Sequence, residues 1–304
     1  MDRTWRLIHS PGGRVRLGWR LVLFMGMAVV TTEVAALGLA RFGLAGSAAA
    51  TLLGVLLASA VTLRMDGRGL GALGFHLAPS VPREALLGGL LGVGLVVVVV
   101  GLMAVAGVVR WVPGGGSLPA WVGGALGAAG LLMLPAAAEE ALLRGYPLQA
   151  LSEEWGPAWG LGLTSVAFGA LHLANPGATA LGAVNTGAAG LFLGVVYLRT
   201  GSLWWASGAH LGWNWGLGYL AGLPVSGLTV VTSPPAQGLL HGPAWLTGGS
   251  FGPEGSVVAT LGFLAAAAAC WWGSWLAPEP AALERRPLAL AGPRDERERD
   301  PTAA

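Results

Sequence analysis

Three short groups of polar residues stand inside apolar stretches of the chain, and each places side chains with chemical potential four residues apart. They are Glu139-Glu140-x-x-x-Arg144, Phe168-x-x-x-His172 and His210-x-x-x-Asn214. Residues four apart lie on one face of a helix, so the members of each pair point the same way. The three groups therefore predict a carboxylate, two imidazoles and a carboxamide that helices can aim at a common point.

Within the first group the two glutamates have different surroundings. Glu140 precedes Arg144 by four residues, the orientation in which a carboxylate reaches a guanidinium. Glu139 is rotated by about 100° from its neighbour on a helix and is left free. A purely structural reading is also open, in which an ion pair stands beside a solvated glutamate at a helix end.

A free carboxylate beside two imidazoles can activate water. Glu139 would take the proton from the water, and His172 would position it. The face of His210 and Asn214 offers two side-chain donors for the oxyanion that forms when water attacks an amide carbonyl. This arrangement predicts a hydrolase that uses no serine or cysteine nucleophile.

The same atoms could instead hold a metal. Glu139, His172 and His210 would supply three ligands and leave the fourth position to water, as catalytic zinc prefers. The sequence lacks the His-Glu-x-x-His spacing that is typical of zinc peptidases. We therefore favour a mechanism that requires no cofactor and keep Zn²⁺ as the alternative.

The composition indicates what kind of element positions these residues. Hydrophobic residues make up 54% of the 304, charged residues 11%, and the mean hydropathy is +0.65. A soluble domain carries about a quarter of its residues charged, so the sequence predicts an integral membrane protein. The net charge of +2 arises from arginines beside apolar runs, without a continuous basic face, which indicates membrane topology and no nucleic-acid partner.

Eight apolar stretches are long enough to cross a bilayer, which takes roughly 20 residues. They lie at about 17–40, 46–63, 84–109, 120–151, 157–174, 178–198, 203–221 and 256–277. We predict an all-α, polytopic bundle of about eight transmembrane helices with a polar intramembrane cavity. Residues 1–277 would form one transmembrane domain with the catalytic helices at about 119–221, and residues 278–304 a charged, disordered cytoplasmic tail.

The arginines predict the orientation of the bundle. With the amino terminus in the cytoplasm, only Arg41 and Arg110 of the arginines near predicted spans fall outside. This asymmetry follows the positive-inside rule and predicts a multi-pass protein of the cell (inner or plasma) membrane with both termini cytoplasmic. An outer loop at about 222–255 and surface positions for His9, His76 and His241 complete this prediction.

Depth in the bilayer constrains the fourth span. At about 1.5 Å per residue, Glu139 reaches the level of His172 and Asn214 only if its helix continues to about Leu151. Arg144 would then be paired inside the protein. Pro135 removes one backbone hydrogen bond, and we expect it to kink the helix just ahead of the carboxylates.

In this order on successive membrane helices, the three motifs resemble those of the CAAX prenyl endopeptidase type II family. This group is also called the CPBP or abortive-infection family of intramembrane proteases. The resemblance covers about residues 119–220, and no motif residue departs from the pattern. It implies an eight-helix intramembrane endopeptidase, with a conical cavity open to the cytosol, acting on a membrane-associated peptide or protein that enters from the cytosol or the membrane.

The resemblance also implies roles, residue by residue. Glu139 and His172 would activate water, and His210 and Asn214 would form the oxyanion hole. Glu140, Arg144 and Phe168 would support them. Bacteria generally lack prenylated substrates, and bacterial relatives are associated with bacteriocin maturation, self-immunity and peptide signalling.

Two other classes of function fit the same residues. A non-proteolytic immunity or scaffold protein of this family would use the polar cluster only to hold helices together. A small proton-coupled transporter would use Glu139 as its titrating group. We find no inverted repeat, which many transporters show, and this weakens the transporter reading.

Overall fold

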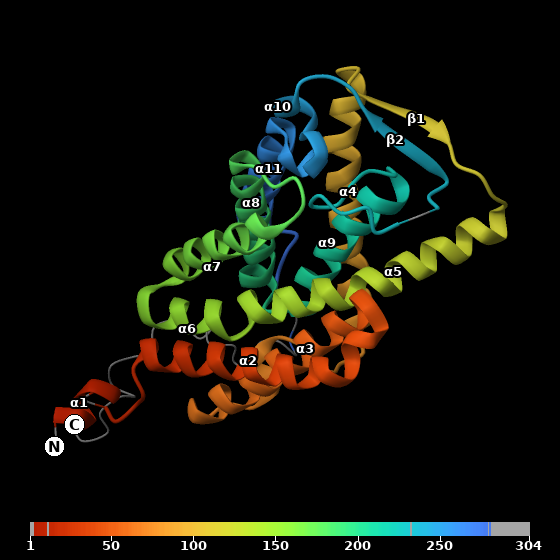
Figure 1. Cartoon of the computed structure of the whole chain (residues 1–304). Helices are drawn as coiled ribbons and strands as arrows, with labels where there is room; N and C mark the ends of the chain where they lie inside the picture. The colour runs from red at the N-terminus through yellow and green to blue at the C-terminus, as the bar shows by residue number, and fades with distance from the viewer. Residues whose placement is uncertain (1–2, 11, 232, 279, 281–304) are drawn as a thin grey trace.

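The computed structural model of the chain describes residues 3–10, 12–231, 233–278 and 280 (Figure 1). The predicted disordered tail lies, from residue 281 onward, outside the described residues. The helices are α1 (Arg3–Ile8), α2 (Leu17–Leu39), α3 (Gly43–Met65), α4 (Val81–Val105), α5 (Leu118–Glu140), α6 (Tyr146–Trp155), α7 (Pro157–Leu171), α8 (Ala180–Thr200), α9 (Leu203–Trp215), α10 (Ala244–Thr247) and α11 (Val257–Trp272). Short turns of other helical types connect several of them.

Each of the eight predicted apolar stretches coincides with a helical segment. In the described part of the chain, four segments are long and apolar enough to cross a membrane, and Val257–Trp272 is apolar but shorter. The four are Leu17–Met65, Val81–Val105, Leu118–Trp155 and Ala180–Thr200. The prediction of an all-α, multi-pass membrane protein is confirmed, whereas eight separate crossings stay a prediction.

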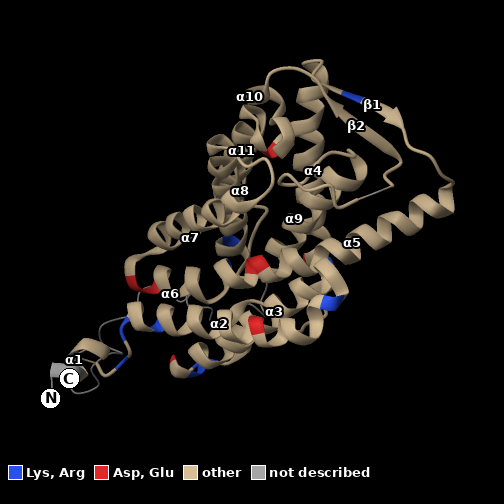
Figure 2. Cartoon of the chain, in the orientation of Figure 1, with Lys and Arg blue, Asp and Glu red and all other residues tan. Residues whose placement is uncertain are grey.

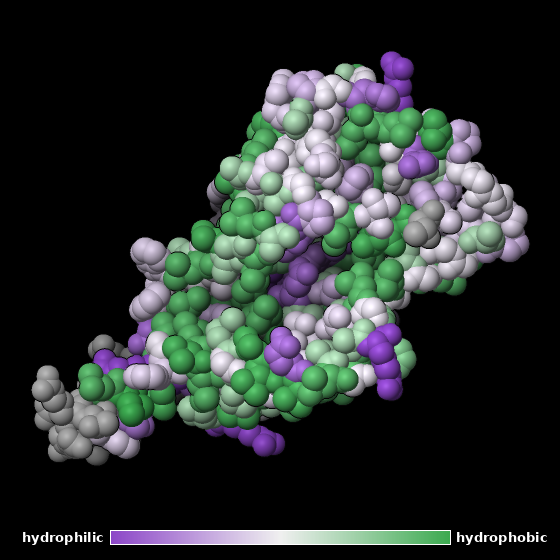
Figure 3. Space-filling model, in the orientation of Figure 1, coloured by the Kyte–Doolittle hydropathy of each residue, from purple (hydrophilic) through white to green (hydrophobic). Residues whose placement is uncertain are grey.

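The surface has the character expected of a protein in lipid. Most of the helix length in Figure 2 carries no charged residue, and large apolar side chains such as Val105 and Leu37 are almost fully exposed. A hydrophobic exterior costs little in contact with lipid tails. Figure 3 shows a hydrophilic hollow in the middle of this largely hydrophobic face.

The helix that carries the two glutamates is continuous, as the depth argument predicts. Residues Leu118–Trp155 form one helical segment, in which α5 and α6 are joined by a π-helical turn at Ala141–Gly145. α5 continues through Pro135, so this proline does not end the helix, and the kink expected there stays a prediction. The π-helical turn directly follows the two carboxylates.

Helices α4 and α9 approach each other closely along glycines. A Cβ atom on Gly92 of α4 would lie 2.1 Å from the Ala209 carbonyl oxygen, and one on Gly212 of α9 would lie 2.1 Å from the Gly89 carbonyl oxygen. Only residues without a Cβ allow this backbone contact. The contact holds α9, which carries His210 and Asn214, firmly against α4.

A two-stranded antiparallel sheet lies beside the helices. Strands β1 (Val109–Pro113) and β2 (Ala236–Leu240) pair with Val109 opposite Leu240. β2 belongs to the predicted outer loop, and its partner β1 follows α4 in the chain (Figure 1).

Ionic contacts join the start of α2 to the ends of α3 and α6. Asp66 accepts hydrogen bonds from Arg14, Arg20 and Tyr146, and Glu153 pairs with Arg14 at 2.7 Å. Burial alone would lower the pKa of Arg14, but the hydrogen bond to Glu153 and the charges of Asp66 and Glu153 raise it overall. The guanidinium therefore stays charged, and it fixes the end of the helix that carries the glutamates.

The surface position expected for His76 is wrong. Its side chain is buried, and its Nε2 atom lies 2.8 Å from Glu84 Oε1. Ser80 and Ser202 donate to the same carboxylate. The partner Ser202 is distant in the sequence, so local polarity around His76 could not reveal this buried cluster.

Candidate active site

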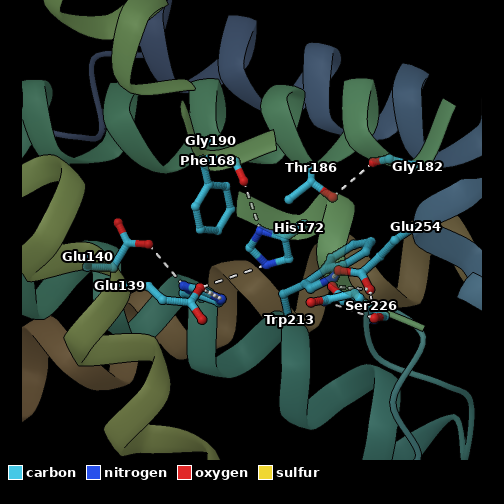
Figure 4. Close-up of polar contacts among 12 residues, drawn as sticks. Glu139, Glu140, Phe168, His172, Gly182, Thr186, Gly190, Trp213, Ser226 and Glu254 are labelled. Atoms are coloured by element: carbon cyan, nitrogen blue, oxygen red, sulfur yellow. Dashed lines mark hydrogen bonds and ion pairs between the residues drawn. The ribbon is translucent and has the colours of Figure 1, made fainter. Parts of the chain in front are cut away.

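The four predicted site residues Glu139, His172, His210 and Asn214 line one cavity of about 240 Å³. Glu139 lies in the last turn of α5, and His172 begins a short 3₁₀ turn directly after α7. His210 and Asn214 lie one turn apart on α9. Figure 4 shows Glu139 and His172 pointing toward each other across this space.

Both long helices change type beside the site. The π-helical turn Ala141–Gly145 begins directly after Glu140, and a second one, Gly216–Leu220, begins two residues after Asn214. Such turns are rare and frequently mark functional sites. A π-helical turn changes the direction in which the following side chains point. Glu139 and Asn214, which precede the two turns, face the cavity, whereas most residues of the turns themselves are buried.

One oxygen of Glu139 faces both imidazoles. Glu139 Oε2 lies 4.0 Å from His172 Nε2 and 3.8 Å from His210 Nε2. This oxygen has no hydrogen-bond partner among the described residues. The distances are too long for a hydrogen bond but suit a water molecule that bridges the three groups.

The Nδ1 atom of each imidazole lies within hydrogen-bond distance of an acceptor, which is a backbone carbonyl for His172 and a carboxylate for His210. His172 Nδ1 lies 2.8 Å from the Phe168 carbonyl oxygen, and His210 Nδ1 lies 2.9 Å from Glu140 Oε1. A carbonyl and an ion-paired carboxylate can only accept, so both Nδ1 atoms carry the proton. Both Nε2 atoms are therefore turned toward Glu139.

The supporting residues form a layer behind the imidazoles. Arg144 Nη1 pairs with Glu140 Oε1 at 3.1 Å, and Arg144 Nη2 donates to the Gly190 carbonyl oxygen at 3.0 Å. The guanidinium stacks over the Phe168 ring at 4.4 Å, and that ring contacts His172 edge-on at 4.6 Å. The pairing expected of Glu140 and Arg144 is thus present, and it extends to the orientation of both histidines.

The cavity also contains polar residues that the sequence reading missed. Asn175, Thr186, Ser226 and Glu254 line it together with the four predicted residues. Ser226 and Glu254 come from the predicted outer loop, whose glycine and proline content indicated only a connection. The one available signal was an acidic residue, Glu254, two positions before the final apolar stretch.

The residues do not fit a metal cage as they stand. In the described part of the chain, no group of three or more His, Cys, Asp or Glu side chains is arranged to hold a metal ion. Tetrahedral zinc with bonds of about 2.0–2.1 Å would need Glu139 and the two imidazoles closer together than 3.8–4.0 Å.

Comparison with known proteins identifies the region that contains the site. Residues 120–216 match the family model of type II CAAX prenyl endopeptidase Rce1-like proteins. This region is Rce1-like. The Rce1-like region covers about a third of the chain and contains all three motifs, from α5 to the end of α9. Over these residues the chain is similar to type II CAAX prenyl endopeptidases. Neither a curated protein nor a solved structure matches the chain.

Proposed function

We propose that the protein is an intramembrane endopeptidase that hydrolyses a peptide bond of a membrane-associated protein or peptide. The observation that carries this proposal is the carboxylate of Glu139 facing the Nε2 atoms of His172 and His210 at 4.0 and 3.8 Å. All three groups line a single cavity in apolar surroundings. This is the geometry that a general base and a bound water require.

The positions of the polar atoms support the following reaction. A water held between Glu139 and His172 gives one proton to Glu139, while its oxygen attacks the carbonyl carbon of the substrate. His172 Nε2 accepts the hydrogen bond from the second O–H of the water and so aims the attack. The tetrahedral intermediate then collapses, and Glu139 returns the proton to the leaving amine nitrogen.

His210 and Asn214 lie on the adjoining face of α9 and would stabilise the oxyanion. A protonated His210 donates from Nδ1 to Glu140 and keeps its Nε2–H for the developing charge. The Asn214 carboxamide adds a second donor from the same wall of the cavity. Removing one donor of this kind costs about 10²–10³ in rate.

The lining indicates the class of substrate. Leucines, valines and phenylalanines make up most of the cavity wall, so an apolar, membrane-associated segment is the segment that the wall accommodates best. We propose entry from the cytosolic side or from the bilayer, in a cell membrane protein with cytoplasmic termini. Nucleic acid has no part in this proposal.

The first test is cleavage of hydrophobic candidate peptides by purified protein in liposomes, followed by mass spectrometry. Glu139→Gln should lower the rate by about 10²–10⁴ because the general base is lost. Glu33→Gln is the matched control, since Glu33 is an exposed glutamate of α2 outside the cavity lining. Equal rates for Glu139→Gln and the parent would refute the assignment.

The same assay separates the alternatives. Cleavage by the metal-free mechanism should persist after treatment with a chelator, whereas a zinc enzyme with Glu139, His172 and His210 as ligands should lose activity and regain it with Zn²⁺. A scaffold or immunity protein would cleave no peptide, and its Glu139→Gln variant would lose only stability or partner binding.

A further inference from the structure

We propose that Glu254 is a positioning residue that sets the spacing of the two catalytic histidines. This inference rests on the proposed function, because it concerns the geometry of the same site. Glu254 precedes α11 and lines the cavity on the wall formed by Trp213 and Ser226 (Figure 4). Its side chain makes no contact with Glu139 that the structure records, so it would act through other residues.

The Glu254 carboxylate holds α9 directly. Glu254 Oε1 accepts a hydrogen bond of 2.9 Å from Trp213 Nε1. Trp213 is buried, packs on Phe263 of α11 with ring centroids 4.5 Å apart, and directly precedes Asn214. Fixing its indole fixes the rotation of α9, and this rotation aims His210 and Asn214 into the cavity.

The second carboxylate oxygen is connected to the end of α7 through Ser226 and Asn175. Glu254 Oε2 accepts hydrogen bonds from the backbone N–H and the hydroxyl of Ser226. The Ser226 carbonyl in turn accepts a 3.0 Å bond from Asn175 Nδ2, and the Asn175 N–H donates to the His172 carbonyl at 3.1 Å. One carboxylate therefore connects the turn that carries His172 to the helix that carries His210.

Ser226, which bonds the Glu254 carboxylate, has an unusual backbone conformation. Ser226 has φ of 46° and is the non-glycine residue with positive φ in the described part of the chain. This conformation is costly for a residue with a Cβ and persists only where neighbouring contacts enforce it. Ser226 lies in a tight turn in which Val225 and Leu228 bond each other, and the two bonds from Ser226 to Glu254 hold this turn at the cavity wall.

The anchoring of Glu254 itself is independent of the catalytic residues. Its backbone carbonyl accepts a 2.8 Å bond from Asn185 Nδ2 of α8, and the same amide nitrogen bonds the Ser256 carbonyl at 2.7 Å. Asn185 is fully buried. The carboxylate thus extends from a fixed point between α8 and α11, as a positioning group requires.

The decisive experiment measures hydrogen exchange on the full-length protein in liposomes. Glu254→Ala should raise exchange at the Ser226 and Asn175 amides at least tenfold. Glu84→Ala is the matched control, because Glu84 is equally buried and accepts three polar contacts outside the cavity. Unchanged exchange at Asn175 in Glu254→Ala, or the same increase in Glu84→Ala, would overturn the proposal.

The second readout separates positioning from general stability. With any peptide that the parent cleaves, Glu254→Gln should lower kcat by about 10- to 100-fold through displaced catalytic groups, with KM within about twofold. Glu84→Gln should leave kcat unchanged at temperatures where it is folded. Equal kcat values for Glu254→Gln and the parent would overturn the proposal.

The proposal can still be tested if the Glu254 variants do not fold or if the parent cleaves no peptide. If the Glu254 variants fail to fold, Trp213→Phe removes the indole N–H that donates to Glu254 and keeps an aromatic ring against Phe263, and it should reproduce the loss of kcat. If the parent cleaves no peptide, the proposed function fails, but the exchange measurement still decides whether Glu254 holds the two segments together.

Discussion

Glu140 and Arg144 are both completely buried, and each compensates the charge of the other. Glu140 Oε2 and Arg144 Nε have no hydrogen-bond partner among the described residues, so the pair stabilises the protein less than a fully satisfied one. The pair also orients His210, because His210 Nδ1 donates a hydrogen bond to Glu140 Oε1. The pair is better explained by the orientation of an imidazole than by stability alone.

Removal of one partner should be more harmful than removal of both. Arg144→Met leaves the buried Glu140 charge uncompensated and should cost about 3–5 kcal/mol of unfolding free energy. The double variant Glu140→Gln, Arg144→Met should recover part of this, since neither charge of the buried ion pair remains. Denaturant unfolding in detergent measures both. A double variant no more stable than Arg144→Met would contradict this account.

The rate of peptide cleavage should not recover together with stability in the double variant. The double variant removes the carboxylate that accepts from His210 Nδ1, so cleavage should stay low even where stability is recovered. Recovery of cleavage together with stability would mean that the ion pair has no role in orienting His210.

Residue spacing predicts contacts within a helix better than contacts between helices. The pairing of Glu140 with Arg144 follows from a separation of four residues, and similar depths in the bilayer suggested that Glu139, His172, His210 and Asn214 could meet in one cavity. The bond between His210 and Glu140 could not be predicted, because a single sequence does not indicate which helix faces touch.

At the scale of elements, the glycines between α4 and α9 set how closely the site-bearing helix can pack. Small residues spaced by four permit such contacts, but they recur throughout this glycine-rich chain and do not locate the contact in the sequence. The structure locates it at Gly88 and Gly92 of α4 and at Gly208 and Gly212 of α9.

Gly92→Ala and Gly94→Ala should have opposite effects. A methyl group at Gly92 would meet the Ala209 carbonyl at 2.1 Å and the Trp213 nitrogen at 2.6 Å, whereas nothing lies within 4 Å of a Cβ at Gly94. Overpacking should lower the stability of Gly92→Ala by about 1–3 kcal/mol. Gly94→Ala should be neutral or up to about 1 kcal/mol more stable through helix propensity.

Thermal unfolding of both variants in detergent checks this prediction, because both substitutions lie in the same helix. Similar melting temperatures for the two would show that α4 and α9 are not held at this distance.

The apolar stretches and their helices could be predicted because lipid requires long apolar runs. The π-helical turns could not, since Ala141–Gly145 and Gly216–Leu220 have no composition that separates them from α-helix. Pro135 lies inside α5, which stays helical through it. The segment after Gly222 was misjudged because its buried contacts, such as Glu254 with Trp213, are made across the fold.

At the scale of the whole molecule, the orientation in the membrane stays a prediction that the arginines support. Leu70, between α3 and α4, is predicted to face the cytoplasm, and Trp245 of α10 the outside. Both side chains are exposed. In a Cys270→Ala background, a membrane-impermeant maleimide should label Trp245→Cys on intact cells and Leu70→Cys only after lysis. The reverse labelling would invert the topology.

The size of the cavity has a consequence for turnover. A volume of about 240 Å³ is many times the roughly 10–15 Å³ that one water molecule needs, so the cavity has room for several waters, and a bound peptide would displace most of them. Hydrolysis consumes one water molecule per catalytic cycle, so water must enter the cavity from outside the hydrocarbon layer between cycles. Catalysis of this kind should slow when osmolytes reduce the activity of water, even though every side chain stays in place.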